Sequence, residues 1–284
     1  MPAPYTPSPR IGATDPPLPD GPASNAAPHR ELLDNRRHLR GSTWGQLIWS
    51  GRIVVGGTHT APEVTVGAIE AVTLRDGSGV WRPYYALAET TVGAAQVEGG
   101  GSLSADTWYY LYAHDAGGTG SVQFQLSTTA PTATQTWKDA GGTALYRYLG
   151  CFPTDGSGDP FPLRAVHGHY RYDTPIAVGN SYQTPGDGEL VSLAAYIPPH
   201  TRHVDGRASV TRSTSTNNLL AHVLDPSGSA SSASKRAWSV VMSSVPAGTT
   251  FAGTFSMLTD SSRRVRVVGD TDSVVTLSVV GFEE

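Results

Sequence analysis

The chain has 284 residues, of which only 15% are charged and 38% are hydrophobic, and it carries 32 glycines and 21 prolines. Glycine and proline are poor helix formers, so this composition argues against a helix-rich fold. The net charge of −4 leaves no basic footprint for nucleic acid, and no apolar stretch approaches the length of a membrane span. The single cysteine, Cys151, excludes an intramolecular disulfide, a zinc site built on cysteines and an iron–sulfur cluster.

Residues 1–27 are a proline-rich segment with almost no large apolar side chains. Such a segment cannot bury enough surface to fold alone and favours polyproline II, although the same composition is typical of a floppy linker. We expect an extended arm that anchors the chain on another protein. Its expected anchoring residues are Pro4, Tyr5, Pro9, Pro16 and Pro17.

Residues 28–43 contain a short predicted helix over 28–40. Pro28 suits the first helical position, and Gly41 suits the position after the last turn. So short a helix with one apolar stripe is marginal in isolation, so we expect it to pack on a partner or on other copies of the chain. The apolar residues expected to make this contact are Leu32, Leu33 and Leu39.

The rest of the sequence predicts an all-β protein with two antiparallel β-sandwich or jelly-roll-like units. A first β domain is expected over 44–173, a connector over 174–188 and a C-terminal sandwich over 189–284. The predicted strands cover 45–55, 63–74, 80–88, 107–114, 121–127, 144–151, 162–172, 189–197, 205–212, 219–224, 236–243, 249–257, 263–268 and 273–281.

One turn sequence occurs twice, as Asp76-Gly77-Ser78-Gly79 and as Asp155-Gly156-Ser157-Gly158. Glycine accepts a positive φ, so both are expected to be hairpin corners. The second also resembles the opening of a calcium loop, but Pro160 stands where such a loop needs glycine. We therefore favour a plain turn at both places.

Motifs of the common catalytic sites are missing, among them G-x-S-x-G, H-E-x-x-H and the phosphate-binding loop. The acidic residues lie mostly in or beside turns, and no acidic cluster indicates the carboxylate pair of a glycosidase. His167 and His169 would share one face of a strand, and His200 and His203 are a weaker pair of the same kind. For lack of further ligands we favour a solvated or subunit-facing strand, and we expect no catalytic residue, metal or cofactor.

Aromatic side chains concentrate in the first β domain. Buried, they are ordinary sandwich core with hydroxyls at the rim; exposed, they would stack on sugar rings or fill a protein interface. Both faces of the strand around 108–112 carry large residues, so we expect one of them to be covered by something other than its own domain, for example a neighbouring subunit. The candidate glycan or interface residues are Trp108, Tyr110, Tyr112, Tyr146, Tyr148, Tyr170 and Tyr172.

Four short motifs follow one another in a distinctive order over residues 104–161. They are Trp108-Tyr109-Tyr110-Leu111-Tyr112, Leu126-Ser127-Thr128 with Pro131, Tyr146-Arg147-Tyr148-Leu149-Gly150 and Thr154-Asp155-Gly156-Ser157-Gly158. This stretch resembles a segment common in bacteriophage fibre and other virion proteins. The resemblance implies a trimeric or otherwise symmetric, non-enzymatic virion module without catalytic residues.

The arm, the helix and the β units together predict a structural component of a phage or phage-like particle, of fibre or receptor-binding type. We expect a homotrimer that binds other virion proteins through the arm and a glycan on the host surface, with no nucleic acid and no membrane insertion. The chain starts without a secretory signal, so we expect synthesis in the host cytoplasm, release by lysis and residence in the virion. A capsid decoration protein and a carbohydrate-binding or depolymerase module of the virion are the alternatives.

Overall fold

The computed structural model describes residues 47–49, 51–115, 117–131, 137–139, 145–182, 187–201, 203–213, 219–228, 236–243, 245–270 and 272–284. Nearly all of them belong to one compact unit, Ile48–Glu284. The expected arm over 1–27, the expected helix over 28–40 and all the anchoring residues of these two segments lie outside the described residues.

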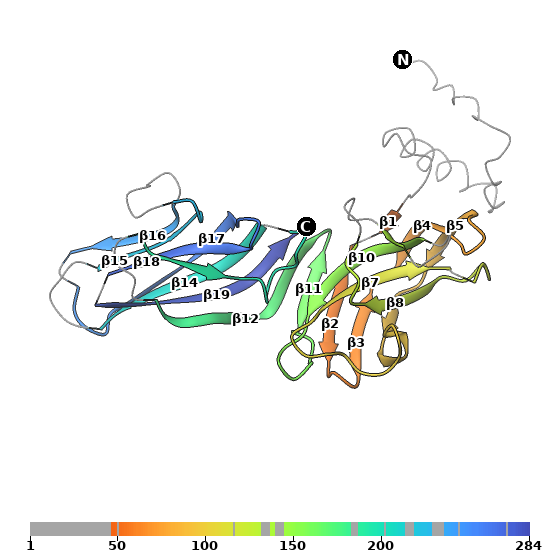
Figure 1. Cartoon of the computed structure of the whole chain (residues 1–284), viewed down its shortest axis with the longest axis horizontal. Coiled ribbons are helices and arrows are strands. Elements are labelled where there is room, and N and C mark those ends of the chain that lie inside the picture. Colours follow the sequence, from red (N-terminus) through yellow and green to blue (C-terminus); the bar gives the residue numbers. More distant parts are fainter. Residues whose placement is uncertain are drawn as a thin grey trace, which may run out of the picture. The chain divides into compact units, whose positions relative to one another are not determined.

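The described part of the chain is all-β, as the sequence predicts, with one 3-10 turn at Ala94–Gln96 (Figure 1). Among the described residues, no helix is long and apolar enough to span a membrane. The strands are β1 Leu47–Trp49, β2 Ile53–Gly57, β3 Pro62–Val66, β4 Ile69–Arg75, β5 Trp81–Leu87, β6 Thr90–Val92, β7 Trp108–His114, β8 Gln123–Ser127, β9 Trp137–Asp139, β10 Leu145–Pro153, β11 Leu163–Val166, β12 His169–Tyr182, β13 Glu189–Ser192, β14 His203–Arg212, β15 Leu219–Leu224, β16 Arg236–Met242, β17 Thr250–Leu258, β18 Arg264–Gly269 and β19 Ser273–Glu283.

These strands form three antiparallel sheets. A seven-stranded sheet has the order β1-β4-β10-β7-β8, with β5 on β4 and β9 on β10. An eight-stranded sheet has the order β17-β14-β19-β12-β11-β2-β3-β6, and a four-stranded sheet has the order β13-β18-β15-β16. The eight-stranded sheet therefore takes strands both from the range 44–173 and from the range 189–284.

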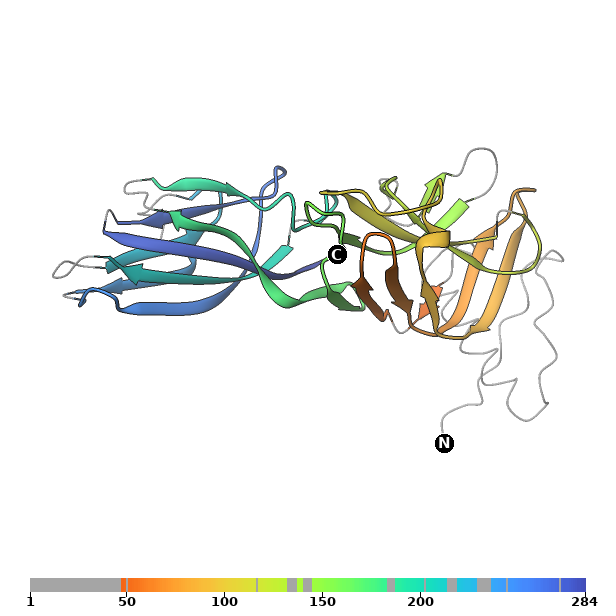
Figure 2. The same ribbon diagram turned by 90° about the horizontal axis from the view of Figure 1, so that it is seen from below.

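The four-stranded sheet lies against β14 and β19 (Figure 2). Burial alternates along β19, where Val275, Leu277 and Val279 are buried and the residues between them are half-buried. Val223 of β15 and Val267 of β18 are fully buried on the facing sheet. Side chains on a strand alternate between its two faces, so this period-two pattern places one continuous apolar layer between the two sheets.

The β12 strand differs from the sequence prediction. It runs through 174–182, which was expected to be an irregular connector, and pairs with β19 as far as Tyr182. The strand expected over 162–172 is also interrupted, because His167 and Gly168 form a turn with φ of 52° and 84°. Partner strands far away in the sequence supply the hydrogen bonds that extend β12, so its local composition does not reveal it.

Candidate functional site

An aromatic ladder runs along one face of β7 and β10. Tyr148 pairs with Tyr112 across the two strands, and their ring centroids lie 5.8 Å apart. Tyr110 follows at 6.3 Å from Tyr148. At the other end the rings of Tyr146 and His114 stack at 4.1 Å with an interplanar angle of 5°. Residues two apart on a strand share a face, so the two Y-x-Y repeats bring four of the predicted aromatics together.

The other three predicted aromatics surround Phe282 of β19. Tyr170 stacks on Phe282 with ring centroids 4.4 Å apart, while Trp108 and Tyr172 lie at 5.8 Å and 6.2 Å from it. Trp108 and Tyr146 are partly exposed, and the other five predicted aromatics are buried. Most of these rings therefore serve as core.

The chain itself covers both faces of β7. Tyr109 and Leu111 on one face are 3% and 1% exposed, and Tyr110 on the other face is 2% exposed. Tyr109 stacks on Phe152 of β10 with ring centroids 5.9 Å apart. On the Tyr110 face the ring of His200, from beyond the predicted first β domain, lies 5.9 Å away. The cover expected from outside that domain is therefore present, and it comes from the same chain rather than from a neighbouring subunit.

At its His114 end the ladder meets a surface groove of about 540 Å³ formed by β6, residues 95–99, β7 and β8. Its size is that of an ordinary small-molecule site. The residues that line it are mostly uncharged: Thr90, Thr91, Val92, Ala95, Gln96, Val97, Glu98, Gly99, His114, Gln123, Phe124 and Gln125.

Glu98 is the acidic residue among those that line this groove. Its carboxylate accepts a hydrogen bond from the Ser127 hydroxyl. Burial raises the pKa of the Tyr146 phenol, and the charge of Glu98 adds to that effect. The side-chain oxygen of Gln96 accepts a hydrogen bond of 2.9 Å from the backbone N–H of Gly93. Amides, hydroxyls and a few apolar side chains suit a neutral polar ligand.

At the other end of the ladder, the Glu284 side chain is 11% exposed and accepts four hydrogen bonds. Its Oε1 lies 2.6 Å from the Tyr148 hydroxyl, 3.1 Å from Cys151 Sγ and 2.6 Å from His200 Nε2. Its Oε2 accepts a bond of 2.9 Å from the Tyr170 hydroxyl. These groups come from β10, β12, the segment before β14 and the residue that follows β19.

The electrostatics of this cluster keep the Glu284 carboxylate ionised beside neutral hydroxyl and thiol donors. Burial alone would raise the pKa of Glu284, but the bonds from His200, Tyr148 and Cys151 hold it below its ordinary value. Burial, with the nearby Glu284 charge, raises the pKa of the Cys151 thiol. Burial also raises the pKa of the Tyr148 and Tyr170 phenols. Thiol, imidazole and carboxylate atoms that could hold a metal lie within 4.8 Å of one another here.

The predicted histidine pairs are separated. His167 lies in the turn before β12, so it does not share a strand face with His169, whose side chain is 68% exposed. Glu283 lies 3.6 Å from His169 and 3.5 Å from His203, whereas His200 belongs to the Glu284 cluster. A second groove, of about 490 Å³, is lined by His169 together with residues of β14, β16, β17 and β19.

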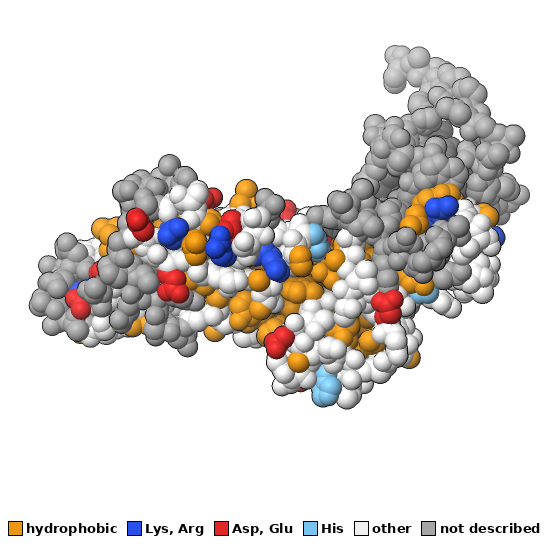
Figure 3. Space-filling model, in the orientation of Figure 1, with side chains coloured by type: hydrophobic (Ala, Val, Ile, Leu, Met, Phe, Trp, Pro, Cys, Tyr) orange, Lys and Arg blue, Asp and Glu red, His pale blue; other side chains and the backbone are white. Residues whose placement is uncertain are grey.

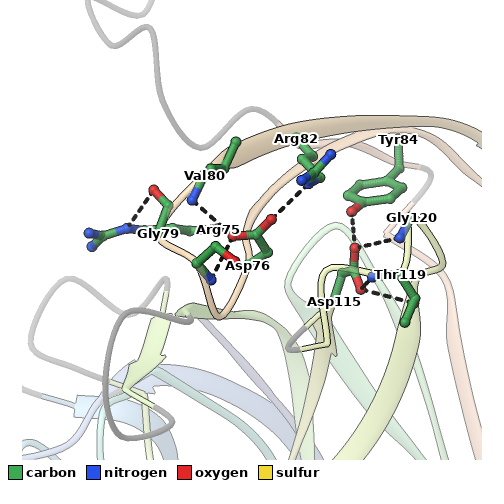
Figure 4. A network of polar contacts seen from close by, with 10 residues as sticks. Arg75, Asp76, Gly79, Val80, Arg82, Tyr84, Asp115, Thr119 and Gly120 are labelled. Atoms are coloured by element: carbon green, nitrogen blue, oxygen red, sulfur yellow. Dashed lines mark hydrogen bonds and ion pairs between the residues drawn. The ribbon is translucent and has the colours of Figure 1, made fainter.

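Several aspartates accept backbone N–H groups of their own turns, where the sequence places most of the acidic residues. In both copies of the repeated turn, aspartate Oδ1 accepts backbone N–H groups two and four residues further on. Asp76 also accepts a bond of 2.7 Å from Arg82, while Asp115 accepts bonds from Tyr84, Thr119 and Gly120 (Figure 4). Oδ1 of Asp155 accepts bonds within its own turn, and Oδ1 of Asp159 accepts the backbone N–H of His59, so this segment forms the expected turn.

Several residues at the two ends of the aromatic ladder were not predicted from the sequence. Gln96, Gln123 and Gln125 carry no motif, and neither does Glu284. A His and a Cys separated by many residues reveal a site only when the fold brings them together. Comparison with protein families, with curated proteins and with solved structures finds no match to this chain.

Proposed function

We propose that the chain is a non-enzymatic structural component of a phage or phage-like particle, of fibre or receptor-binding type. In this proposal the segment 1–43, an extended arm and a short helix, anchors the chain on other virion proteins. The β strands build two sandwich-like units that face outward, as a homotrimer, and the groove beside His114 binds a neutral glycan of the host surface.

The positions of the virion-like motifs support this proposal. The W-Y-Y-x-Y motif is β7, the L-S-T motif ends β8, and the Y-R-Y-L-G motif lies in β10. These three strands are hydrogen-bonded neighbours in one sheet, and the T-D-G-S-G turn follows β10 directly. Motifs spread over residues 104–161 thus belong to a single structural element, which is what a shared module would require.

The observation that carries the binding role is the composition of the groove. Thr90, Thr91, Gln96, Gln123 and Gln125 offer hydroxyl and amide groups, and Phe124 adds an aromatic ring. Protein sites for neutral sugars need many neutral donors and acceptors next to an apolar surface, so that hydroxyls find partners while ring faces find contact. Charged side chains are also sparse on the described surface seen in Figure 3.

The same groove supports a role without catalysis. Glycoside hydrolysis needs two carboxyl groups about 5 to 9 Å apart across the scissile bond. Among the residues that line the groove, Glu98 is the acidic one, and it is bonded to Ser127. Other described carboxylates, such as those of Asp76 and Asp155, accept backbone N–H groups in turns.

The experiment is a glycan array probed with the full chain, followed by calorimetry on the sugars retained. We expect binding of neutral oligosaccharides, and Gln123→Ala should weaken it about tenfold because one hydrogen bond to the ligand is lost. Thr254→Ala, an exposed change on β17 at the second groove, is the control and should bind normally. Release of reducing sugar, or sensitivity of binding to Thr254→Ala alone, would contradict the proposal.

A further inference from the structure

The cluster around Glu284 contains the donor set of a metal site, independently of the proposed function. Cys151 comes from β10, His200 from the segment between β13 and β14, and Glu284 directly follows β19. Their sulfur, nitrogen and oxygen atoms all lie within 4.8 Å of one another. Cys151 is 1% exposed, and the side chains of His200 and Glu284 are 11% exposed. Three different elements thus direct three ligand types at one buried point.

The distances suit a small tetrahedral ion. Zinc binds sulfur at about 2.3 Å and nitrogen or oxygen at about 2.0 to 2.2 Å, which places neighbouring ligand atoms about 3.3 to 3.6 Å apart. Here Cys151 Sγ lies 3.1 Å and His200 Nε2 lies 2.6 Å from Glu284 Oε1, the spacing of hydrogen bonds. To admit the ion, Sγ and Nε2 would have to lie about 0.4 to 0.8 Å further from Oε1 than they do here.

The chemistry of the donors selects the ion. A thiolate is soft and an imidazole is borderline, and this combination favours Zn²⁺ over Mg²⁺ or Ca²⁺, which prefer oxygen ligands alone. When the ion binds, the Cys151 thiol and the His200 Nε2 position lose any proton they carry, and the protons leave to solvent. One thiolate and one carboxylate balance the two charges of the ion, so the loaded site is neutral, as a buried site should be.

Outer residues hold the ligands in place. The Tyr170 hydroxyl donates to Oε2 of Glu284 at 2.9 Å, which leaves Oε1 turned toward Cys151 and His200. The His200 ring is flanked by Tyr110 and Tyr148, with centroids 5.9 Å and 5.7 Å away. Such outer hydrogen bonds and packing orient first ligands in protein metal sites.

We propose that Cys151, His200 and Glu284 are the three protein ligands of a structural Zn²⁺ site. The Tyr148 hydroxyl, 2.6 Å from Glu284 Oε1 and 3.4 Å from His200 Nε2, or a water molecule in its place, occupies the fourth position. The ion ties β10, the segment before β14 and the end of β19 together.

The test uses the full chain, stripped with chelator and titrated with Zn²⁺ against a fluorescent zinc indicator, and with Co²⁺ as a spectroscopic substitute. We expect one Zn²⁺ per chain and a Co²⁺ spectrum with a thiolate charge-transfer band. Cys151→Ser should remove that band, and His200→Gln should weaken Zn²⁺ binding at least tenfold. Tyr170→Phe should keep the band and weaken binding by about 10- to 100-fold.

His203→Gln is the matched control, because His203 lies three residues from His200 yet contacts Glu283 and Ser256 instead. It should bind Zn²⁺ as the unchanged chain does. Absence of stoichiometric Zn²⁺ in the folded, unchanged chain would overturn the proposal without relying on any variant. So would a Co²⁺ spectrum without a thiolate band, or equal loss of binding in His203→Gln and His200→Gln.

Discussion

The ring of Phe255 on β17 packs against the backbone of Gly206, its paired residue on β14. A Cβ atom at position 206 would lie 2.1 Å from Cζ of Phe255, and the ring is 6% exposed. The glycine therefore provides room for an aromatic ring that covers the strand, and the pair acts as one packing unit.

Gly206→Ala should displace the Phe255 ring and destabilise the fold by about 1 to 3 kcal/mol, the usual effect of overpacking. The matched control is Gly56→Ala on β2, where an added Cβ would meet nothing within 4 Å. It should change the free energy of unfolding by less than about 1 kcal/mol, in the stabilising direction. Urea denaturation of both variants is the measurement, and equal effects would contradict the packing argument.

The repeated turn allows a comparison between two aspartates. Asp76 is 1% exposed and accepts a bond from Arg82, which is the main cause of its lowered pKa, whereas Asp155 is half-buried. Asp76→Asn should therefore destabilise the fold by about 1 kcal/mol more than Asp155→Asn, a modest value because Arg82 is partly exposed.

The pH dependence of that difference has a defined sign. A lowered carboxyl pKa stabilises the fold above the ordinary value of 3.8, and the benefit is lost as the pH falls through the folded pKa. The difference in the free energy of unfolding between Asp76→Asn and the unchanged chain should therefore shrink as the pH falls below 3.8. A gap that stays constant from pH 7 to pH 3 would show that the carboxylate charge has no role.

The burial of His222 on β15 predicts a second dependence of fold stability on pH. Its side chain is fully buried, and its Nδ1 lies 2.9 Å from the Ser239 hydroxyl. Burial, followed by the charge of Arg236, lowers the pKa of His222 from 6.5 to about 4. The unfolded chain therefore binds the proton more tightly, so stability is complete above pH 6.5 and falls as the pH drops toward 4.

The loss should reach about 3 kcal/mol at most, since one pKa unit corresponds to about 1.4 kcal/mol. His222→Leu should flatten the stability profile between pH 6.5 and pH 4, measured by urea denaturation. His167→Asn, an exposed change in the turn before β12, is the control and should keep the slope of the unchanged chain. If the slope persists in His222→Leu, another group is responsible.

The anchoring role proposed for the N-terminal segment predicts the behaviour of a truncation. Removing residues 1–40 should leave the β strands folded, with an unchanged far-UV circular dichroism signal per residue of strand. It should abolish incorporation into particles assembled with the shortened chain. Normal incorporation would refute the anchor, while labelled full chains found on heads rather than tails would favour a decoration protein.

Local sequence patterns are sufficient for most of the strands. The alternation of apolar and polar residues over 273–281 predicts a strand, and β19 covers Ser273–Glu283. The run over 219–224 matches β15 at both ends. The repeated D-G-S-G sequence forms the same turn twice, because the aspartate side chain reaches the backbone N–H groups of its own turn.

Longer-range contacts decide the features that local patterns miss. The β12 strand continues through 174–182 only because β19 supplies its hydrogen bonds. The short strands β6 and β9, which no pattern marks, likewise pair with β3 and β10. The local sequence does not determine these pairings, which form only when the sheets pack together.

The sequence itself determines the scarcity of charge, which is a matter of composition. It also determines most strands and the aspartate turns, because these depend on residues only a few positions apart. The burial of the tyrosines and the meeting of Cys151, His200 and Glu284 follow from the tertiary structure alone. Side chains from distant segments meet only where packing brings their strands together, and a local sequence pattern does not show which distant residues become neighbours.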